Sequence, residues 1–143
     1  MKKFLSVLFA VLTITCFSAC DLSHKHFTDN FGVCKTCSED ISVLIEKNGN
    51  NSYVQTNFNL QVYTDTFLKF VSNGESSLTI KIECANSTIK SIILYSKTDD
   101  YIASTYNTQN PVLTCNEQLI AGETYYIKIQ SDKFADAKII LET

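Results

Sequence analysis

The stretch Leu78-Thr79-Ile80-Lys81-Ile82-Glu83-Cys84 alternates apolar and polar side chains without interruption. Because successive side chains of a β-strand point to opposite faces, this period of two is typical of a strand with one buried face. The same alternation recurs at 54–62, where the even-numbered positions are mostly apolar, and at 124–130. These stretches therefore predict half-buried antiparallel strands.

Further strand candidates are separated by short segments rich in Asn, Asp and Gly, which are turn signals. The candidate strands lie at 67–71, 91–96, 101–105, 112–119 and 138–142. Some seven to nine short strands, with no convincing amphipathic helix, are expected along the chain. This pattern predicts an all-β fold, an antiparallel β-sandwich over residues 41–143.

Several strand motifs in this region occur in an order that is found in a known family. The motifs lie at 66–70, 78–82, 92–95 and 102–104, and the most specific is Ala121-Gly122-Glu123-Thr124-Tyr125-Tyr126-Ile127. Together they resemble the bacterial pre-peptidase C-terminal domain over about 64–143. The resemblance implies a jelly-roll-like sandwich that accompanies secreted enzymes, helps in binding or maturation, and has no catalytic residues of its own.

The first nineteen residues have the pattern of a bacterial lipoprotein signal peptide. Two lysines precede an apolar run at 4–17, and Phe17-Ser18-Ala19-Cys20 places small residues before a cysteine. The run is shorter than the roughly 20 residues of a membrane-spanning helix. We expect residues 1–19 to be removed and Cys20 to be lipidated, which would anchor the protein on the extracytoplasmic side of a bacterial membrane, in the periplasm or at the cell surface. An ordinary signal peptide cut elsewhere is the alternative.

The expected mature chain is acidic. Removal of residues 1–19 takes away Lys2 and Lys3 and no acid, so 12 basic and 15 acidic residues become 10 and 15, a formal net charge of −5. Every basic residue is a lysine. The chain has no arginine side chains to bind phosphate in a bidentate way and no cluster of basic residues, so it lacks the positive charge that nucleic-acid binding requires. Nucleic acid is therefore excluded as a class of partner.

Residues 20–40 are polar and irregular and are predicted to be a tether, but they contain a candidate zinc site. The four donors are His24, His26, Cys34 and Cys37, and zinc takes four such ligands in a tetrahedron. The segment resembles a short zinc knuckle in which Ser38 replaces the usual glycine. The alternatives are a local disulfide, which is the common fate of paired thiols outside the cytoplasm, a redox pair, and histidines that are simply solvated residues of the tether.

Two further sets of residues are candidate sites because of the face of the strand on which each residue is expected to lie. Cys84 and Cys115 share the inward phase of apolar strands, which predicts a disulfide between them; two separate buried thiols are the alternative. Outward-phase tyrosines are candidates for a binding surface, because exposed aromatic side chains often anchor protein or sugar ligands. These tyrosines are Tyr53, Tyr63 and Tyr126.

Catalytic motifs are missing from the sequence: both histidines lie in the expected tether, and there is no G-x-S-x-G or H-E-x-x-H. The expected function is a non-catalytic binding or envelope-structural module with a protein or glycan ligand and, at most, zinc as a cofactor. One alternative is a carbohydrate-binding module, which would gather its outward tyrosines on one face. Another is a redox protein or enzyme that uses Cys34 and Cys37.

Overall fold

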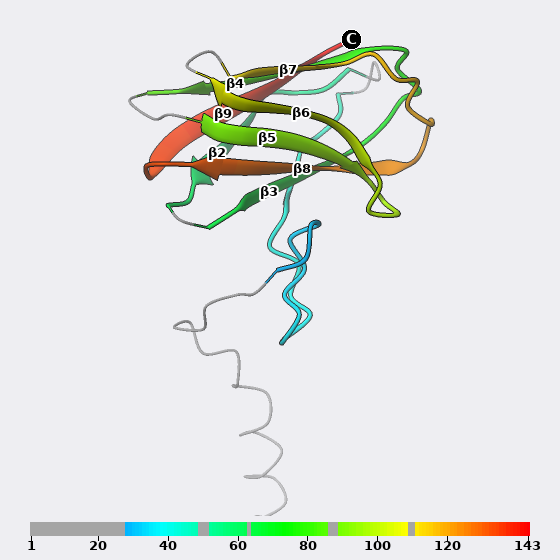
Figure 1. Ribbon diagram of the computed structural model, residues 1–143. Coiled ribbons are helices and arrows are strands. Elements are labelled where there is room, and N and C mark those ends of the chain that lie inside the picture. The colour runs from blue at the N-terminus through cyan, green and yellow to red at the C-terminus, as the bar shows by residue number, and fades with distance from the viewer. Residues whose placement is uncertain (1–27, 49–51, 63, 86–88, 109–110) are drawn as a thin grey trace, which may run out of the picture.

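The computed structural model describes residues 28–143 apart from 49–51, 63, 86–88 and 109–110 (Figure 1). Two β-sheets pack face to face. The described residues contain no helix, and hence none that is long and apolar enough to cross a membrane. The five-stranded sheet has the order β1 (Val43–Leu44), β3 (Thr66–Val71), β8 (Thr124–Ser131), β5 (Ile89–Ser96), β6 (Tyr101–Thr108). The four-stranded sheet has the order β2 (Thr56–Leu60), β9 (Ala135–Glu142), β4 (Leu78–Cys84), β7 (Val112–Cys115).

The strand pairings confirm the predicted all-β sandwich. Neighbouring strands pair antiparallel, except that β1 pairs parallel with β3. The candidate strand at 112–119 is shorter than expected, because β7 ends at Cys115. Leu119 is still buried, and its backbone N–H donates to the Glu75 carbonyl. The apolar pattern at 112–119 therefore covers a strand that ends at Cys115 and a buried loop that follows it.

The core lies between the two sheets and is built from the alternating apolar rows. Leu78, Ile80 and Ile127 are fully buried, as the period-two pattern predicted. The register between β5 and β8 shifts between Ile89 and Ser91. Residues three apart would otherwise face opposite sides, so this irregularity allows both Ile89 and Ile92 to enter the core.

A buried carboxylate, Glu75, closes one end of the sandwich after β3. It accepts hydrogen bonds from the Tyr53 hydroxyl at 2.7 Å, from the Asn73 backbone N–H at 3.0 Å and from the Ser72 hydroxyl. Burial alone would raise the pKa of Glu75, but these donors stabilise its charged form and hold the pKa below its usual value. Burial and the adjacent carboxylate raise the pKa of Tyr53. The network fixes Tyr53 to the loop between β3 and β4.

Candidate binding surface

Residues 28–40, which belong to the predicted tether, form a compact loop that we call the docked segment. Its Asp29 carboxylate accepts hydrogen bonds from the backbone N–H groups of Phe31 at 2.8 Å and Val33 at 2.9 Å. Short acidic side chains commonly stabilise turns in this way. Backbone bridges also pair Thr28 with Cys34 and Val33 with Asp40. This part of the chain is therefore ordered by its own hydrogen bonds rather than irregular.

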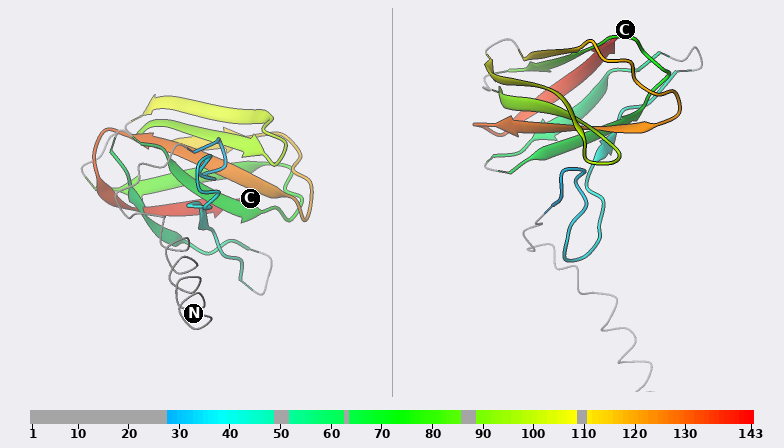
Figure 2. Two further views of the ribbon diagram at one scale, coloured as in Figure 1. Left: turned by 90° about the horizontal axis from the view of Figure 1, so that it is seen from below. Right: turned by 45° about the vertical axis from the view of Figure 1, so that its right-hand side comes forward.

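The docked segment lies over β3 and β8 on the outer face of the five-stranded sheet (Figure 2). Phe67 on β3 alternates with the core residue Leu68 and so faces outward, yet it is only 3% exposed. Gly32 lies directly on it: a Cβ atom at Gly32 would stand 2.7 Å from the Phe67 Cβ. Beside this contact, the ring of Phe31 packs on that of Tyr126 of β8, with centroids 4.7 Å apart. Aromatic and backbone packing thus join the segment to two neighbouring strands.

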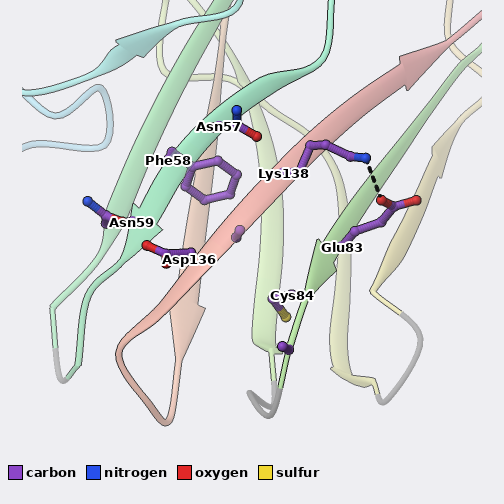
Figure 3. A pocket seen from close by; sticks show the side chains of 9 residues that line it. Asn57, Phe58, Asn59, Glu83, Cys84, Asp136 and Lys138 are labelled. Carbon is purple, nitrogen blue, oxygen red and sulfur yellow. Dashed lines mark ion pairs between the residues drawn. The ribbon is translucent and has the colours of Figure 1, made fainter.

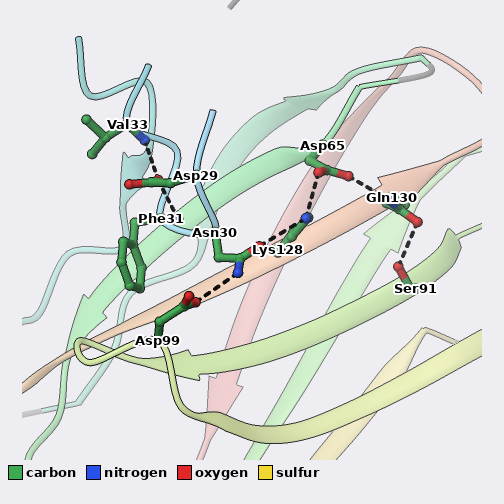
Figure 4. Close-up of polar contacts among 9 residues, drawn as sticks. All are labelled: Asp29, Asn30, Phe31, Val33, Asp65, Ser91, Asp99, Lys128 and Gln130. Atoms are coloured by element: carbon green, nitrogen blue, oxygen red, sulfur yellow. Dashed lines mark hydrogen bonds and ion pairs between the residues drawn. The ribbon is translucent and has the colours of Figure 1, made fainter. Parts of the chain in front are cut away.

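A row of polar contacts ties the docked segment across the same face (Figure 4). The Asn30 side chain donates to Asp99, in the turn between β5 and β6, at 2.8 Å and accepts from Lys128 of β8 at 3.3 Å. Lys128 also pairs with Asp65 at 2.9 Å, and Asp65 accepts from Gln130 at 2.8 Å. The polar side chains beneath and beside the docked segment are therefore hydrogen-bonded or ion-paired with one another.

The cysteine pair of the candidate zinc site lies in the docked segment. Cys34 is 1% exposed and Cys37 is partly buried. The Ser38 N–H donates to the Cys34 carbonyl at 2.8 Å, and Ser38 has a φ of 60°, so serine adopts the turn for which glycine was expected. His24 and His26 lie outside the described residues, as do Cys20 and the signal segment. Within the described part of the chain, no group of three or more His, Cys, Asp or Glu side chains could hold a metal ion.

The predicted disulfide between Cys84 and Cys115 is wrong. Cys115 pairs with Leu78 at the start of β4, whereas Cys84 stands at the end of β4 and pairs with Ala137 of β9. Six residues of a strand span about 20 Å. A disulfide requires Cα atoms within about 7 Å. The alternation showed that both cysteines face inward, but it did not show how far apart they lie along the strand direction.

The predicted outward orientation of Tyr53 is also wrong. Its ring packs edge-on against the core residue Phe70 at 5.3 Å, and its hydroxyl donates to the Val71 carbonyl as well as to Glu75. The alternation at 54–62 was extended too far towards the N-terminus, since β2 begins only at Thr56 and Val54 is 43% exposed. Tyr63 lies outside the described residues, so its predicted orientation is left untested.

Tyrosines gather on the same outer face, from Tyr126, which the docked segment contacts, across β5 to the edge strand β6. Tyr126 of β8 pairs directly with Tyr95 of β5, which pairs in turn with Tyr101 of β6. Residues directly opposite each other on neighbouring strands share a face. Tyr101 and Tyr106 are each 60% exposed, whereas Tyr95 and Tyr126 are half-buried. We call these four residues, with Ile93 and Ser104 between them, the tyrosine face.

Sequence reasoning found only Tyr126 of this set. The outward position of Tyr95 follows from the buried Leu94 beside it and was readable from the alternation. Tyr101 and Tyr106 are five residues apart and would face opposite sides of a regular strand. A register irregularity, in which Leu94 pairs with Ala103 but Tyr95 with Tyr101, brings both rings outward. Local sequence carries no clear signal for such an irregularity.

The opposite face of the molecule, on the four-stranded sheet, has a shallow open concavity (Figure 3). Amide, carboxylate and ammonium groups line it, and Lys138 pairs with Glu83 at 3.0 Å. Its one aromatic residue, Phe58, is only 6% exposed. The exposed lining residues lie on β2, β9 and the end of β4, among them Asn57, Asn59, Glu83 and Asp136. No ring is available there for stacking on a ligand.

Comparisons with known proteins identify the fold. No family model and no curated protein matches the chain. Among solved structures, it is similar to PliG from Aeromonas hydrophila, a periplasmic inhibitor of g-type lysozyme, with a TM-score of 0.53 and 13% identity over 71% of this chain and 94% of that one. The pre-peptidase C-terminal domain of a Bacillus anthracis collagenase also matches, with a TM-score of 0.48 and 12% identity over 71% and 94%.

At such identities, the similarity to PliG shows a shared β-sandwich fold. The sandwich that the sequence resemblance implied is thereby confirmed. The Aeromonas hydrophila inhibitor is matched over nearly its whole length.

Proposed function

We propose that this protein is a lipid-anchored, extracytoplasmic, non-catalytic module that binds a protein partner through its tyrosine face. The observation that carries the proposal is the gathering of four tyrosines and Ile93 on the outer face of the five-stranded sheet, where Tyr101 and Tyr106 are each 60% exposed. Tyrosine provides a large, rigid contact area with a polar hydroxyl, which makes it a frequent anchor of protein interfaces. The two most exposed rings, of Tyr101 and Tyr106, would supply most of the new contact area.

A glycan ligand is the second candidate, because tyrosines on one face are what a carbohydrate-binding module requires. Sugar recognition also needs side chains that offer unused hydrogen bonds beside the rings. Here Lys128 and Gln130 already bond to Asp65, and the Tyr101 hydroxyl lies 2.9 Å from that of Ser104. A protein partner fits these residues better, and the function of the similar PliG inhibitor, which acts on a protein, agrees with this choice.

The binding proposal is tested with g-type lysozyme as the protein probe and soluble chitin oligosaccharides as the glycan probe. Affinity is measured by titration calorimetry for the wild type, for Tyr101→Ala with Tyr106→Ala, and for the control Asn57→Ala with Asn59→Ala on the opposite sheet. We expect the lysozyme to bind and the tyrosine variant alone to lose at least about tenfold in affinity. Binding of the oligosaccharides but not the lysozyme, with the same dependence on the tyrosines, would favour the glycan ligand.

The anchor is supported by the basic and apolar leader that ends at Cys20. We expect the wild type to incorporate labelled palmitate and to remain with the membrane fraction. Cys20→Ser should abolish the label and release the protein to the soluble fraction. A wild-type protein that never takes up label would contradict the anchor without bearing on the tyrosine face.

Zinc binding by His24, His26, Cys34 and Cys37 stays a prediction, supported by the turn that Cys34 and Ser38 form. Elemental analysis of the reduced protein, refolded with excess zinc, should find one metal ion per chain. The ion should be lost in Cys34→Ser with Cys37→Ser. Its absence from the wild type would favour a local disulfide or a redox pair.

A further inference from the structure

The four outermost strands of the two sheets differ in how well they are protected against pairing with another strand. β1 has two residues and β2 has five, while β7 has four and follows Pro111. Short edge strands and prolines are common devices that prevent edge-to-edge association. β6 has eight residues, Tyr101–Thr108, and its sequence Tyr-Ile-Ala-Ser-Thr-Tyr-Asn-Thr contains neither proline nor a charge. This edge strand lacks the usual protection.

The side chains of β6 also indicate that its outer edge is open. In the described part of the chain, the only ladder of β6 is with β5. Ala103 and Thr105 pair with Leu94 and Ile92, which are fully buried, yet both remain partly exposed. Inward-facing residues stay partly exposed when no further strand of their own sheet lies beside them, and β7 of the other sheet comes close to β6. The backbone groups on this side are therefore placed to accept a further strand.

We propose that β6 pairs antiparallel with β6 of a second copy of this chain, joining two five-stranded sheets into one. A strand without charges can pair with its own copy without repulsion, and the charges beside it favour the antiparallel orientation. Asp99 and Asp100 stand immediately before β6. A parallel pair would place the two acidic turns side by side, whereas an antiparallel pair separates them by the length of the strand. The strands themselves carry no like charges to repel each other.

The period of two restricts the register of this pair. Outward residues must oppose outward residues, since a shift of one residue would turn every side chain to the wrong face. A two-fold axis through Thr105 satisfies this condition and places Ser104 of each copy opposite Tyr106 of the other. The contact is the same on both copies and closes on itself, so it forms dimers rather than fibres. It brings two tyrosine faces into one continuous surface, but does not depend on what that surface binds.

The test uses charges placed across the predicted axis. Ser104→Lys with Tyr106→Lys sets like charges opposite each other twice, whereas Ser104→Lys with Tyr106→Glu sets opposite charges at the same positions. The full chain is purified in detergent, and its mass is measured by sedimentation across a concentration series. We expect the wild type and the Lys/Glu variant to dimerise and the Lys/Lys variant to dissociate at least about tenfold more readily.

The Lys/Glu variant also controls for folding, because it changes the same two positions, and thermal midpoints of both variants are compared with that of the wild type. A wild type that remains monomeric at high micromolar concentration would overturn the proposal. So would a folded Lys/Lys variant that dimerises as tightly as the Lys/Glu variant.

Discussion

The outer faces of the two sheets are built from the same alternating pattern but are completed in different ways. On the four-stranded sheet, the outward residues include lysines and glutamates that pair across strands, as Lys81 does with Glu142 at 2.6 Å. On the five-stranded sheet, the outward positions include Phe67 and four tyrosines. The docked segment lies over Phe67 and Tyr126. Charged side chains are solvated by water, whereas aromatic rings gain free energy when they are covered. The residue types at the outward positions thus decide which face recruits another part of the chain.

The largest expected effect comes from removing the aromatic ring beneath the docked segment. Phe67→Ala should lower the free energy of unfolding by about 3 kcal/mol, because a buried aromatic side chain and its packing are lost. Urea denaturation measures the change, and Thr79→Ala on the outward phase of β4 is the matched control. A loss below about 1 kcal/mol would mean that the docked segment does not bury Phe67 in solution.

A second substitution examines the same contact from the side of the segment. Gly32→Ala should cost about 2 kcal/mol, because the new Cβ meets Phe67 and the φ of 84° is strained for alanine. Part of this cost should disappear in the Phe67→Ala background, where the conflict with the ring carbons is removed and only that with the Cβ at position 67 remains. Equal costs in both backgrounds would show that the ring of Phe67 does not contribute to the cost.

The buried carboxylate should respond to acid more strongly than the exposed pairs of the four-stranded sheet. The pKa of Glu75 is lower in the folded protein than in the unfolded chain, so its contribution is present above the unfolded pKa and is lost as pH falls through the folded pKa. Below about pH 5, the wild type should therefore lose more stability than Glu75→Gln does. Thermal midpoints between pH 3 and pH 7 measure the difference. Parallel curves for the two proteins would contradict the network with Tyr53.

The smallest effect is expected at the ion pairs. Lys81→Ala and Lys138→Ala should each change the free energy of unfolding by less than about 0.5 kcal/mol, because exposed pairs gain little over solvation. Added salt should reduce even this difference. Denaturation in low and high salt provides the measurement. A loss above about 1 kcal/mol in the free energy of unfolding of either variant would show that the ion pairs of the four-stranded sheet also contribute substantially to stability.

The sequence allowed the strands to be predicted, because alternation is a local property: Leu78, Ile80 and Ile82 follow it without exception. Register is not local, and the error at Cys84 and Cys115 arose from it, since equal phase says nothing about position along a strand. The cover on Phe67 depends on a contact with Gly32, thirty-five residues earlier in the chain. Tyr101 and Tyr106 came together only through a strand irregularity. The strands were therefore predictable. The cover on Phe67 and the tyrosine face were not, because they depend on contacts between distant segments and on a strand irregularity.

The position of the docked segment has a consequence for how the protein would stand on a membrane. With the anchor proposed at Cys20, eight residues connect the lipid to Thr28, a span of at most about 28 Å when fully extended. The chain leaves the sandwich on the outer side of the five-stranded sheet (Figure 2). Such a short connection keeps the sandwich close to the bilayer. Copies held in this way would diffuse in two dimensions, which raises the local concentration at which their edges meet.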